Sequence, residues 1–169
     1  MVIFINGSIN SGKSTVAKLL SKKMGNAVVL EIDVLRNFVE WLPLEEAISI
    51  NWENAFALIK NFVKHDLNVL VPYPISQKNY DVILENLKNI HSEIYFFTLS
   101  PPLETVLKNR GRRNLSGWEI DRIKYHYKIG INNPSFGVVI DNANETPAET
   151  ADKIQTEVKR SFLGKRTLG

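Results

Sequence analysis

Eight residues near the amino terminus, Gly7-Ser8-Ile9-Asn10-Ser11-Gly12-Lys13-Ser14, match the pattern G-x-x-x-x-G-K-[ST] at every fixed position. Glycine at both ends of the pattern allows backbone torsions and a close approach that a Cβ would block. Loop N–H groups that turn inward at the start of a helix attract an anion, and a lysine adds a point charge. The chemistry that this spacing allows is the binding of the terminal phosphates of a nucleotide.

The loop residues have separate expected roles. The Lys13 ammonium is expected to contact the β- and γ-phosphates, and the Ser14 hydroxyl to serve as a ligand of Mg²⁺. The alternative is a glycine-rich turn with a surface lysine. Four fixed positions recur by chance in under about 1% of chains of this size, and the motif lies between a strand signal and a helix signal, so we favour nucleotide binding. The expected nucleotide-binding set is Gly7, Ser8, Asn10, Ser11, Gly12, Lys13, Ser14 and Thr15.

A second group of chemically active residues lies in Glu31-Ile32-Asp33-Val34-Leu35-Arg36, directly after a predicted strand. Strand alternation puts Glu31 and Asp33 on one side, with Asp33 at the edge of the sheet near the phosphates. A carboxylate there could orient or deprotonate an acceptor hydroxyl, or hold Mg²⁺ through water. Arg36 could bind an anionic or hydroxylated acceptor. The alternatives are that Asp33 only caps a helix and that Arg36 is solvated.

A basic cluster, Arg110-Gly111-Arg112-Arg113, lies in a stretch from about 109 to 117 that has no apolar periodicity. Three arginines beside a glycine suggest a lid that closes guanidinium groups onto a transferring phosphoryl group and excludes water. We therefore include Arg110 and Arg113 among the candidate catalytic residues, and Arg122 could also face inward. The alternative is a solvated basic loop, which is the usual role of a charge run.

These side chains require a scaffold, and the sequence predicts alternating strands and helices. Buried parallel strands with helices on both faces bring their carboxyl ends, and the ligands, to one edge of the sheet. Predicted strands are Val2–Asn6, Ala27–Glu31, Asn68–Val71, Ile94–Leu99 and Phe136–Ile140. Predicted helices are Lys13–Met24, a helix capped by Asp33 and running to about Trp41, Asn51–Asp66, Ser76–Ile90 with Tyr80, Ile83, Leu84 and Leu87 inward, Leu103–Lys108, Trp118–Ile129, and a last helix starting at Thr146-Pro147-Ala148-Glu149.

The composition is that of one globular domain. The chain has 169 residues, 44% of them hydrophobic and 23% charged, and a formal charge of +3. Its basic residues are scattered, which disfavours a nucleic-acid partner, and the absence of cysteine excludes disulfides and thiolate metal sites. We see no signal peptide or membrane span, and expect a cytoplasmic monomer or homodimer with a frayed tail from about 164 to 169.

Short motifs add a resemblance to a known group. They are Ile5-Asn6-Gly7 ahead of Ser11-Gly12-Lys13-Ser14, Val69-Leu70-Val71-Pro72, Phe97-Thr98-Leu99, Trp118–Arg122 and Asn133-Pro134. With them the chain resembles the small P-loop kinases of the shikimate-kinase, chloramphenicol-phosphotransferase and adenylate-kinase type, and within that group the bacterial tunicamycin-resistance ATP-binding protein. The resemblance implies a three-layer αβα fold with a five-stranded parallel sheet in 2-3-1-4-5 order, an arginine-bearing lid, and an acceptor pocket over the helices after strand two. It also implies that Arg110 stacks on adenine or touches phosphate, and that the Asp141–Thr146 loop lines the adenine.

The sequence departs from that group at the end of the third strand. Many such kinases carry an acidic residue there and shikimate kinases a glycine triplet, whereas this chain has Val71-Pro72-Tyr73-Pro74. The missing carboxylate shifts the binding of magnesium to Ser14 and Asp33. We expect Tyr73 to contact the acceptor, with Trp41 and Phe56 as further apolar wall, although core packing is the commoner role of a tryptophan. His65, His91 and His126 have no metal-ligand spacing and receive no role.

These patterns favour an ATP- and Mg²⁺-dependent kinase that moves the γ-phosphoryl group of ATP to a hydroxyl of a metabolite, nucleoside or antibiotic. Lys13, Asp33, Arg110 and Arg113 are the candidate catalytic residues, Asp33, Arg36 and Tyr73 the candidate acceptor contacts, and Ser14 and Asp33 the candidate metal ligands. A second hypothesis is a non-catalytic ATP-binding protein that confers drug resistance by sequestration or acts as a nucleotide switch. A third is a nucleic-acid end kinase, which the scattered charge disfavours.

Overall fold

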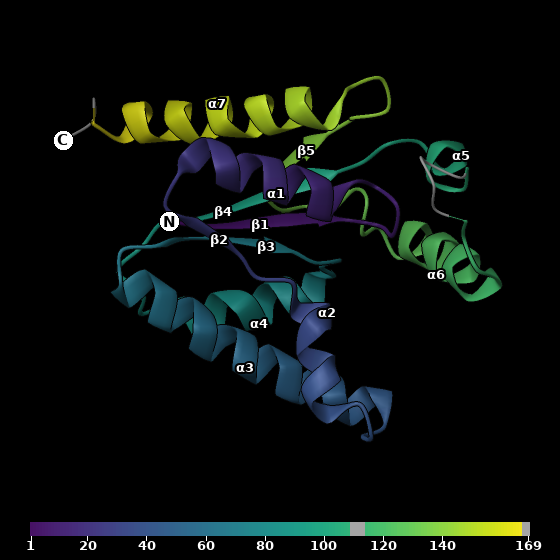
Figure 1. The fold of residues 1–169 in the computed structure, drawn as a ribbon. Helices are drawn as coiled ribbons and strands as arrows, with labels where there is room; N and C mark the ends of the chain where they lie inside the picture. Colours follow the sequence, from purple (N-terminus) through teal and green to yellow (C-terminus); the bar gives the residue numbers. More distant parts are fainter. Residues whose placement is uncertain (109–113, 167–169) are drawn as a thin grey trace.

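The computed structural model describes residues 1–108 and 114–166. A sheet of five strands lies at its centre in the order β2-β3-β1-β4-β5, and every neighbouring pair is parallel (Figure 1). This arrangement confirms the predicted α/β fold class and the predicted strand order. The strands are β1 Val2–Gly7, β2 Ala27–Val29, β3 Asn68–Pro72, β4 Ile94–Leu99 and β5 Val138–Ile140.

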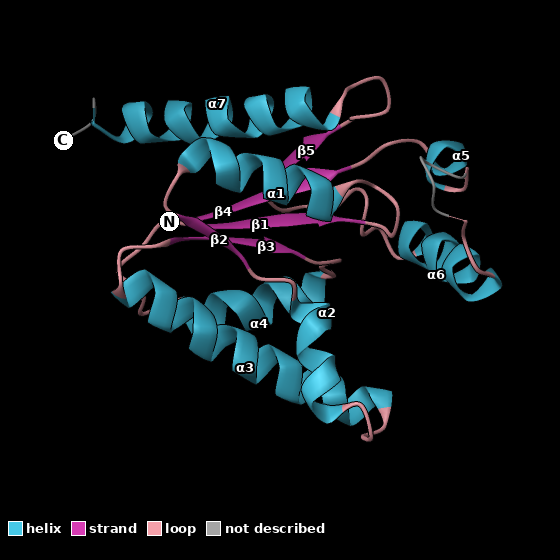
Figure 2. Ribbon diagram, in the orientation of Figure 1, coloured by secondary structure: helices cyan, strands magenta, loops and turns pink. Residues whose placement is uncertain are grey.

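Helices cover both faces of the sheet and one of its ends (Figure 2). On one face lie α1 (Lys13–Met24) and α7 (Pro147–Arg166), and on the other α3 (Leu44–Lys64) and α4 (Gln77–Leu87). The remaining elements lie toward the carboxyl ends of the strands: α2 (Ile32–Leu35), the 3-10 helix η1 (Arg36–Val39), α5 (Leu103–Val106) and α6 (Gly117–Lys128). In the described part of the chain, no helix combines the length and apolar character needed to cross a bilayer.

The core lies on both sides of β1, because successive strand residues face opposite ways. Val2 and Phe4 pack into the cluster beneath α3 and α4, whereas Ile3 and Ile5 pack into the cluster beneath α1 and α7. All six residues of β1 are buried. The unbroken apolar run at the amino terminus is therefore the central strand of a sheet covered on both faces.

Asn6 fixes the carboxyl end of β1 to its surroundings. Its fully buried side chain donates from Nδ2 to Thr98 Oγ1 and to the Ile131 carbonyl, each at 3.0 Å, and its Oδ1 accepts from the Ile75 amide at 2.7 Å. One amide thus joins β1 to β4, to the loop after β3 and to the segment after α6. The loop of the motif, Gly7 to Ser14, begins at the next residue, so this network positions the start of the loop.

The expected helix from Asp33 to Trp41 was wrong in its cap and in its form. Its N-terminal cap is Glu31, without a side-chain cap bond, so Asp33 lies inside the first turn of α2. Strand β2 ends at Val29, and the Leu30 amide makes a last sheet bond to the Leu70 carbonyl. Helix α2 then begins at Ile32, one residue before Asp33. Beyond α2 the backbone tightens into η1. A carboxylate in a first turn is favoured by the helix dipole but remains available to a ligand.

Other boundaries differ for local reasons. Helix α3 starts at Leu44 rather than Asn51, because Pro43 ends the preceding segment and two glutamates follow in the first turn. Strand β5 starts at Val138 rather than Phe136, because Gly137 has a φ of +69°. Leu84 is 38% exposed rather than inward. Residues 164–166, predicted to be frayed, continue helix α7. Residues 167–169 and residues 109–113 of the predicted lid lie outside the described residues.

We expect the substitution Asn6→Ala to lower the free energy of unfolding by about 3 kcal/mol, because it leaves the buried Ile75 amide and Ile131 carbonyl without their partner. Urea denaturation monitored by circular dichroism measures this. Asn86→Ala is the matched control, since Asn86 is exposed and bonds only across its own helix turn to the Val82 carbonyl. Equal stabilities of the two variants would contradict the role given to Asn6.

Candidate active site

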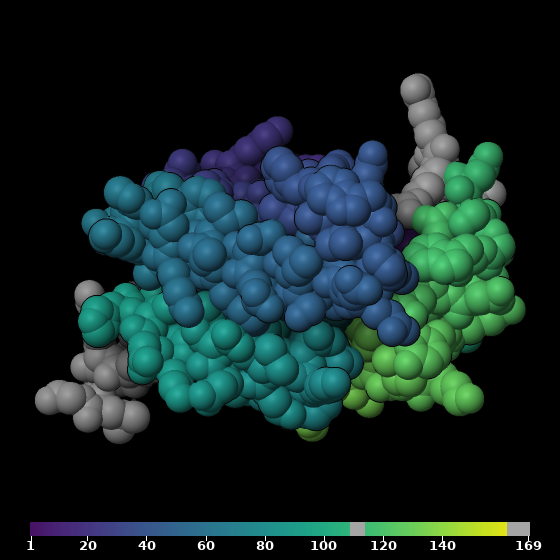
Figure 3. Space-filling view, turned by 90° about the horizontal axis from the view of Figure 1, so that it is seen from below, coloured from purple at the N-terminus to yellow at the C-terminus, as the bar shows by residue number. Residues whose placement is uncertain are grey.

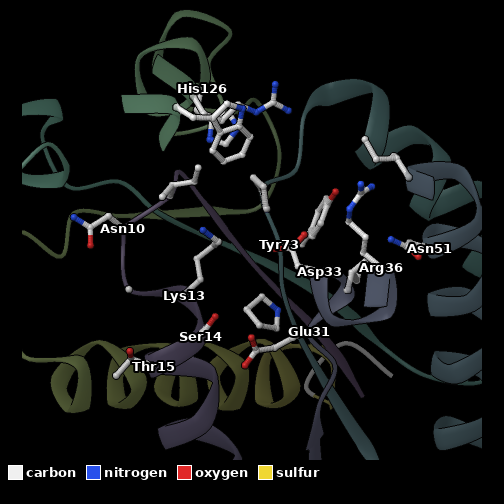
Figure 4. Close-up of a pocket in the computed structure, with 18 of the residues that line it drawn as sticks. Asn10, Lys13, Ser14, Thr15, Glu31, Asp33, Arg36, Asn51, Tyr73 and His126 are labelled. Atoms are coloured by element: carbon white, nitrogen blue, oxygen red, sulfur yellow. The ribbon is translucent and has the colours of Figure 1, made fainter. Parts of the chain in front are cut away.

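A cavity of about 770 Å³ opens at the carboxyl ends of the strands (Figure 4). It brings together most of the predicted site residues: Asn10, Gly12, Lys13, Ser14, Thr15, Asp33, Arg36 and Tyr73 all line it. The remaining loop residues, Gly7, Ser8 and Ser11, are buried. Figure 3 views the molecule from the side of α3 and α4, where residues of α2 and η1 lie across a narrow gap from α6. Two predicted sites, for a nucleotide and for an acceptor, therefore share one cavity.

The backbone of the loop has the conformation that its glycines predict. Gly7, Asn10 and Gly12 have φ values of +140°, +64° and +99°. A Cβ on Gly7 would lie 2.6 Å from the Leu99 carbonyl oxygen, so no larger residue fits there without a shift. Gly12 caps α1 without a side-chain bond. The N-terminus of α1 therefore lies at the cavity, and helix N-termini are common anion-binding positions.

Side-chain amides brace the loop from outside. Asn142 is buried and donates from Nδ2 to the Ser11 carbonyl at 3.1 Å. Asn10 donates from its Nδ2 to the carbonyls of Val106 at 2.8 Å and Lys108 at 3.0 Å. These bonds tie the loop to the segments after β5 and β4. Asn142 belongs to the loop predicted to line adenine, and its contact with Ser11 gives that loop a structural role as well.

Lys13 projects from the start of α1 across the loop, where its Nζ donates to the Ser8 carbonyl at 2.7 Å (Figure 4). This contact holds the ammonium beside the Gly7–Ser14 loop. The positive charge of Lys13 is therefore already next to the loop before a phosphate binds. Ser14 and Thr15 follow on α1 and line the same cavity.

Asp33 lies on the opposite side of the cavity from the loop. Burial raises the pKa of its carboxyl group, the nearby Lys13 ammonium lowers the pKa, and Glu31 raises it further. Glu31 itself pairs with Lys18 of α1 at 2.7 Å. The two carboxylates therefore have different partners, and Asp33 is the one that electrostatics couples to Lys13. The alternative that Asp33 only caps a helix does not describe its position.

Tyr73 follows β3 and forms part of the acceptor-side wall. Burial raises the pKa of its hydroxyl to about 12, with the Asp33 charge acting in the same direction and Arg122 opposing it. The hydroxyl is therefore a neutral donor at physiological pH. The ring packs edge-on against Trp52 at 5.0 Å between centroids, which holds Tyr73 in place.

Two residues expected beside Tyr73 lie elsewhere. Trp41 is 75% exposed, because η1 ends before it and turns it outward. Phe56 is buried in the core and stacks on Trp52. Trp118 of α6 does line the cavity although it is 65% exposed. The apolar wall beside Tyr73 is completed instead by Pro72, Pro74, Leu44 and Ile48.

Among the arginines, Arg36 and Arg122 line the cavity. The Arg122 guanidinium lies over the Tyr125 ring, 5.2 Å from its centroid, and a cation in this position is attracted to the ring face. Arg110 and Arg113 lie outside the described residues, so their catalytic roles stay predictions.

His126 is the main site residue that the sequence analysis missed. It is 2% exposed, lines the cavity wall, and lies 3.3 Å from Ser8 Oγ through its Nδ1. Burial lowers the pKa of its imidazole to about 4, and Arg122 and Lys13 act in the same direction. The available signal was its spacing of four residues from Arg122, which puts both side chains on one face of α6.

The donor set at the cavity fits magnesium. Ser14 and Asp33 both line it, and a hydroxyl and a carboxylate are hard oxygen ligands of the kind that Mg²⁺ takes alongside phosphate oxygens and water. Strand β3 ends at Pro72 and adds no carboxylate. In the described part of the chain, no group of three or more histidine, cysteine or acidic residues forms a metal centre by itself.

Comparison with known proteins gives a partial sequence match. No family model matches the chain. A curated protein named "Putative adenylate kinase", from Sulfurisphaera tokodaii, is 37% identical over 89 residues. This match covers 50% of the chain and 47% of the relative, so the chain aligns with about half the length of that protein.

Solved structures match almost the whole chain. The tunicamycin resistance protein of Deinococcus radiodurans is 21% identical, with a TM-score of 0.65 over 93% of this chain and 94% of that one. A gluconokinase from Sinorhizobium meliloti is 16% identical, with a TM-score of 0.71 over 99% and 97%. The APS kinase of Mycobacterium tuberculosis is 18% identical, with a TM-score of 0.70 over 94% and 96%. The chain has the fold of the small P-loop kinases.

The buried His126 gives the P-loop fold a pH-dependent stability. The imidazole has a pKa of about 4 in the folded chain and 6.5 as its ordinary value. Between these values the unfolded state binds more protons, so stability falls as the pH is lowered through this window. We expect His126→Gln to reduce this dependence by up to about 1.4 kcal/mol per pH unit.

Urea denaturation at a series of pH values from 4 to 7 measures this effect. His91→Gln serves as the control because His91 is exposed, and it should retain the wild-type profile. An unchanged profile in the His126 variant would show that another group produces the dependence.

Proposed function

We propose that the protein is an ATP-dependent phosphotransferase that moves the γ-phosphoryl group of ATP to a hydroxyl of a small molecule. The observation that carries this proposal is that Lys13 of the P-loop and Asp33 face one cavity and influence each other electrostatically. The acceptor oxygen attacks the γ-phosphorus, the bond from that phosphorus to the β,γ-bridging oxygen breaks, and ADP leaves. The proton of the acceptor hydroxyl passes to the Asp33 carboxylate.

Different residues of the cavity have different roles in this transfer. The ammonium of Lys13 and the first amides of α1 bind the terminal phosphates and stabilise the charge that spreads over the transferring group. Asp33 orients the acceptor hydroxyl, and its raised pKa brings it nearer to the range of an effective base. Magnesium, held by Ser14 directly and by Asp33 through water, would neutralise part of the phosphate charge. Arg122 lines the same cavity and would add a further positive charge.

The comparisons support a small acceptor. The proteins that share this fold include a gluconokinase and an APS kinase, and the partial sequence match is to a protein named as an adenylate kinase. A cavity of about 770 Å³ is of the size that takes small ligands. It has to hold both the phosphate end of ATP and the acceptor, which leaves room for a metabolite-sized molecule rather than a polymer.

A second candidate function is ATP binding without transfer, with drug resistance by sequestration. The observation in its favour is that β3 ends at Pro72 with no acidic residue for magnesium, and one protein of the same fold is a tunicamycin resistance protein. We place it second because Asp33 lines the same cavity as Lys13 and is coupled to it electrostatically, an arrangement that supports transfer more than binding alone.

Substitution of Asp33 separates the two functions. Asp33→Asn keeps the shape of the side chain but cannot accept the proton, so we expect kcat to fall by about 10²- to 10⁴-fold while ATP still binds. The assay follows ATP consumption and the mass gain of one phosphoryl group on sugars, gluconate, shikimate, AMP, nucleosides, chloramphenicol and tunicamycin.

Asp152→Asn is the matched control, because Asp152 is exposed and pairs with Lys23 away from the cavity. Full activity of Asp33→Asn would remove Asp33 from the mechanism. Tight ATP binding without transfer to any acceptor in the panel would favour the second candidate.

A further inference from the structure

His126 of α6 is a buried polar ring on the cavity wall with one nitrogen left unpaired. The residue is 2% exposed and lines the cavity. Its Nδ1 lies 3.3 Å from Ser8 Oγ, whereas its Nε2 has no hydrogen-bond partner among the residues that the structure describes. The two ring nitrogens point in different directions, so Nε2 is directed away from Ser8. A nitrogen shielded from water without a partner is costly, and a ligand in the cavity could satisfy it.

Ser8 brings this ring close to the lysine of the loop. Lys13 Nζ donates to the Ser8 carbonyl at 2.7 Å, and the His126 ring contacts the hydroxyl of the same residue. Figure 4 shows the Lys13 ammonium pointing toward the part of the wall where His126 lies. Because both side chains contact one small residue, a phosphate oxygen bound by Lys13 comes within reach of His126.

Two further hydrogen bonds fix the position of the ring. The Ile131 amide donates to the His126 carbonyl at 3.0 Å, and the Ile131 carbonyl accepts from the buried Asn6 side chain at 3.0 Å. Asn6 directly precedes Gly7, so the loop and the ring are held to the same point of the sheet. A donor held in this way is in place before the charge of a reaction develops, which is the condition for stabilising a transition state electrostatically.

The surroundings of the ring keep it neutral at physiological pH. Burial lowers the pKa of the imidazole to about 4, and the cations Arg122 and Lys13 act in the same direction. A neutral imidazole carries one N–H, and its position follows from the bond that the other nitrogen makes. If the Ser8 hydroxyl donates to Nδ1, the ring proton is on Nε2. In that form the imidazole offers a hydrogen-bond donor to an oxyanion and keeps its proton.

We propose that His126 is a further catalytic residue, whose Nε2–H donates a hydrogen bond to an oxygen of the transferring phosphoryl group while the Ser8 hydroxyl donates to Nδ1. This inference rests on the proposed phosphotransferase function and adds one residue to it. The imidazole neither takes nor gives a proton, so the bonds that form and break, and the proton that passes to Asp33, are unchanged. The alternative is that His126 only braces Ser8, which leaves Nε2 unpaired.

Two amides of different length separate the contact with phosphate from the contact with Ser8. In His126→Gln the amide reaches the position of Nε2 and keeps a donor there. In His126→Asn the shorter amide lies near the position of Nδ1 and keeps only a partner for Ser8. We expect His126→Asn to lower kcat by about 10- to 100-fold with little change in the KM for ATP, and His126→Gln to retain most of the activity. A brace alone predicts the opposite order.

The assay uses whichever acceptor of the panel the wild type phosphorylates. His91→Asn is the matched control, because His91 is exposed, and it should keep the kcat of the wild type. Thermal unfolding of each variant shows whether it is folded.

Nitrogen NMR of the wild-type protein with ¹⁵N-labelled histidine gives a readout that needs no acceptor. The spectrum of His126→Gln identifies the His126 signals by their loss. At pH 7 we expect the free protein to carry the ring proton on Nε2. Mg²⁺ with a non-hydrolysable ATP analogue should shift the Nε2 resonance, whereas Mg²⁺ with ADP, which lacks the third phosphate, should leave it near its position in the free protein.

Each outcome decides the proposal. A loss of kcat in His126→Asn that exceeds the loss in His126→Gln supports it. Full kcat in His126→Asn, or a greater loss in His126→Gln, overturns the contact and leaves the phosphotransferase intact. Where both variants lose activity equally, or where no acceptor reacts and the phosphotransferase itself fails, the spectra decide. An Nε2 shift that only the triphosphate analogue produces supports the contact, and equal spectra with the two nucleotides overturn it.

Discussion

A turn that presents its amides to an anion has to be held in shape by bonds on its outer side, and this constraint organises the whole structure. The turn from Gly7 to Ser14 follows the central strand, where the buried Asn6 amide joins three neighbouring segments. Behind the turn, Asn142 and His126 hold the backbone and side chain of the loop from two further segments. The sheet and its crossovers bring these distant residues together, so the phosphate-binding geometry depends on the complete fold.

The acceptor side has a different physical character. There the important groups are two charges that line the cavity, Asp33 and Arg36, one helical turn apart on the short segment after β2. Burial raises the pKa of Asp33, and the Lys13 ammonium opposes that shift. Binding of a polyanion at Lys13 would weaken this opposition. In the proposed mechanism, phosphates bound at Lys13 would therefore change the basicity of Asp33.

The features predicted most accurately were those that depend on residues close together in the sequence. Helix α1 and the loop before it have the predicted bounds, because glycines, a lysine and helical periodicity act within a few residues of one another. The strand order came from the resemblance to the P-loop kinases and is confirmed. The start of α3 was missed because Pro43 both ends the preceding segment and precedes the first turn of a new helix. His126 was missed because its role comes from contacts across the cavity, which no local pattern records. The lid arginines Arg110 and Arg113 stay predictions.

The most direct measurement of the central claim is a crystal structure with Mg²⁺ and a non-hydrolysable ATP analogue. The account predicts that the phosphates lie inside the turn from Gly7 to Ser14, with a γ-phosphate oxygen within hydrogen-bonding distance of Lys13 Nζ and the γ-phosphorus on the side that faces Asp33. Lys13 would then have left the Ser8 carbonyl that it contacts at 2.7 Å. Phosphates bound outside the turn, with Lys13 still on Ser8, would contradict the account.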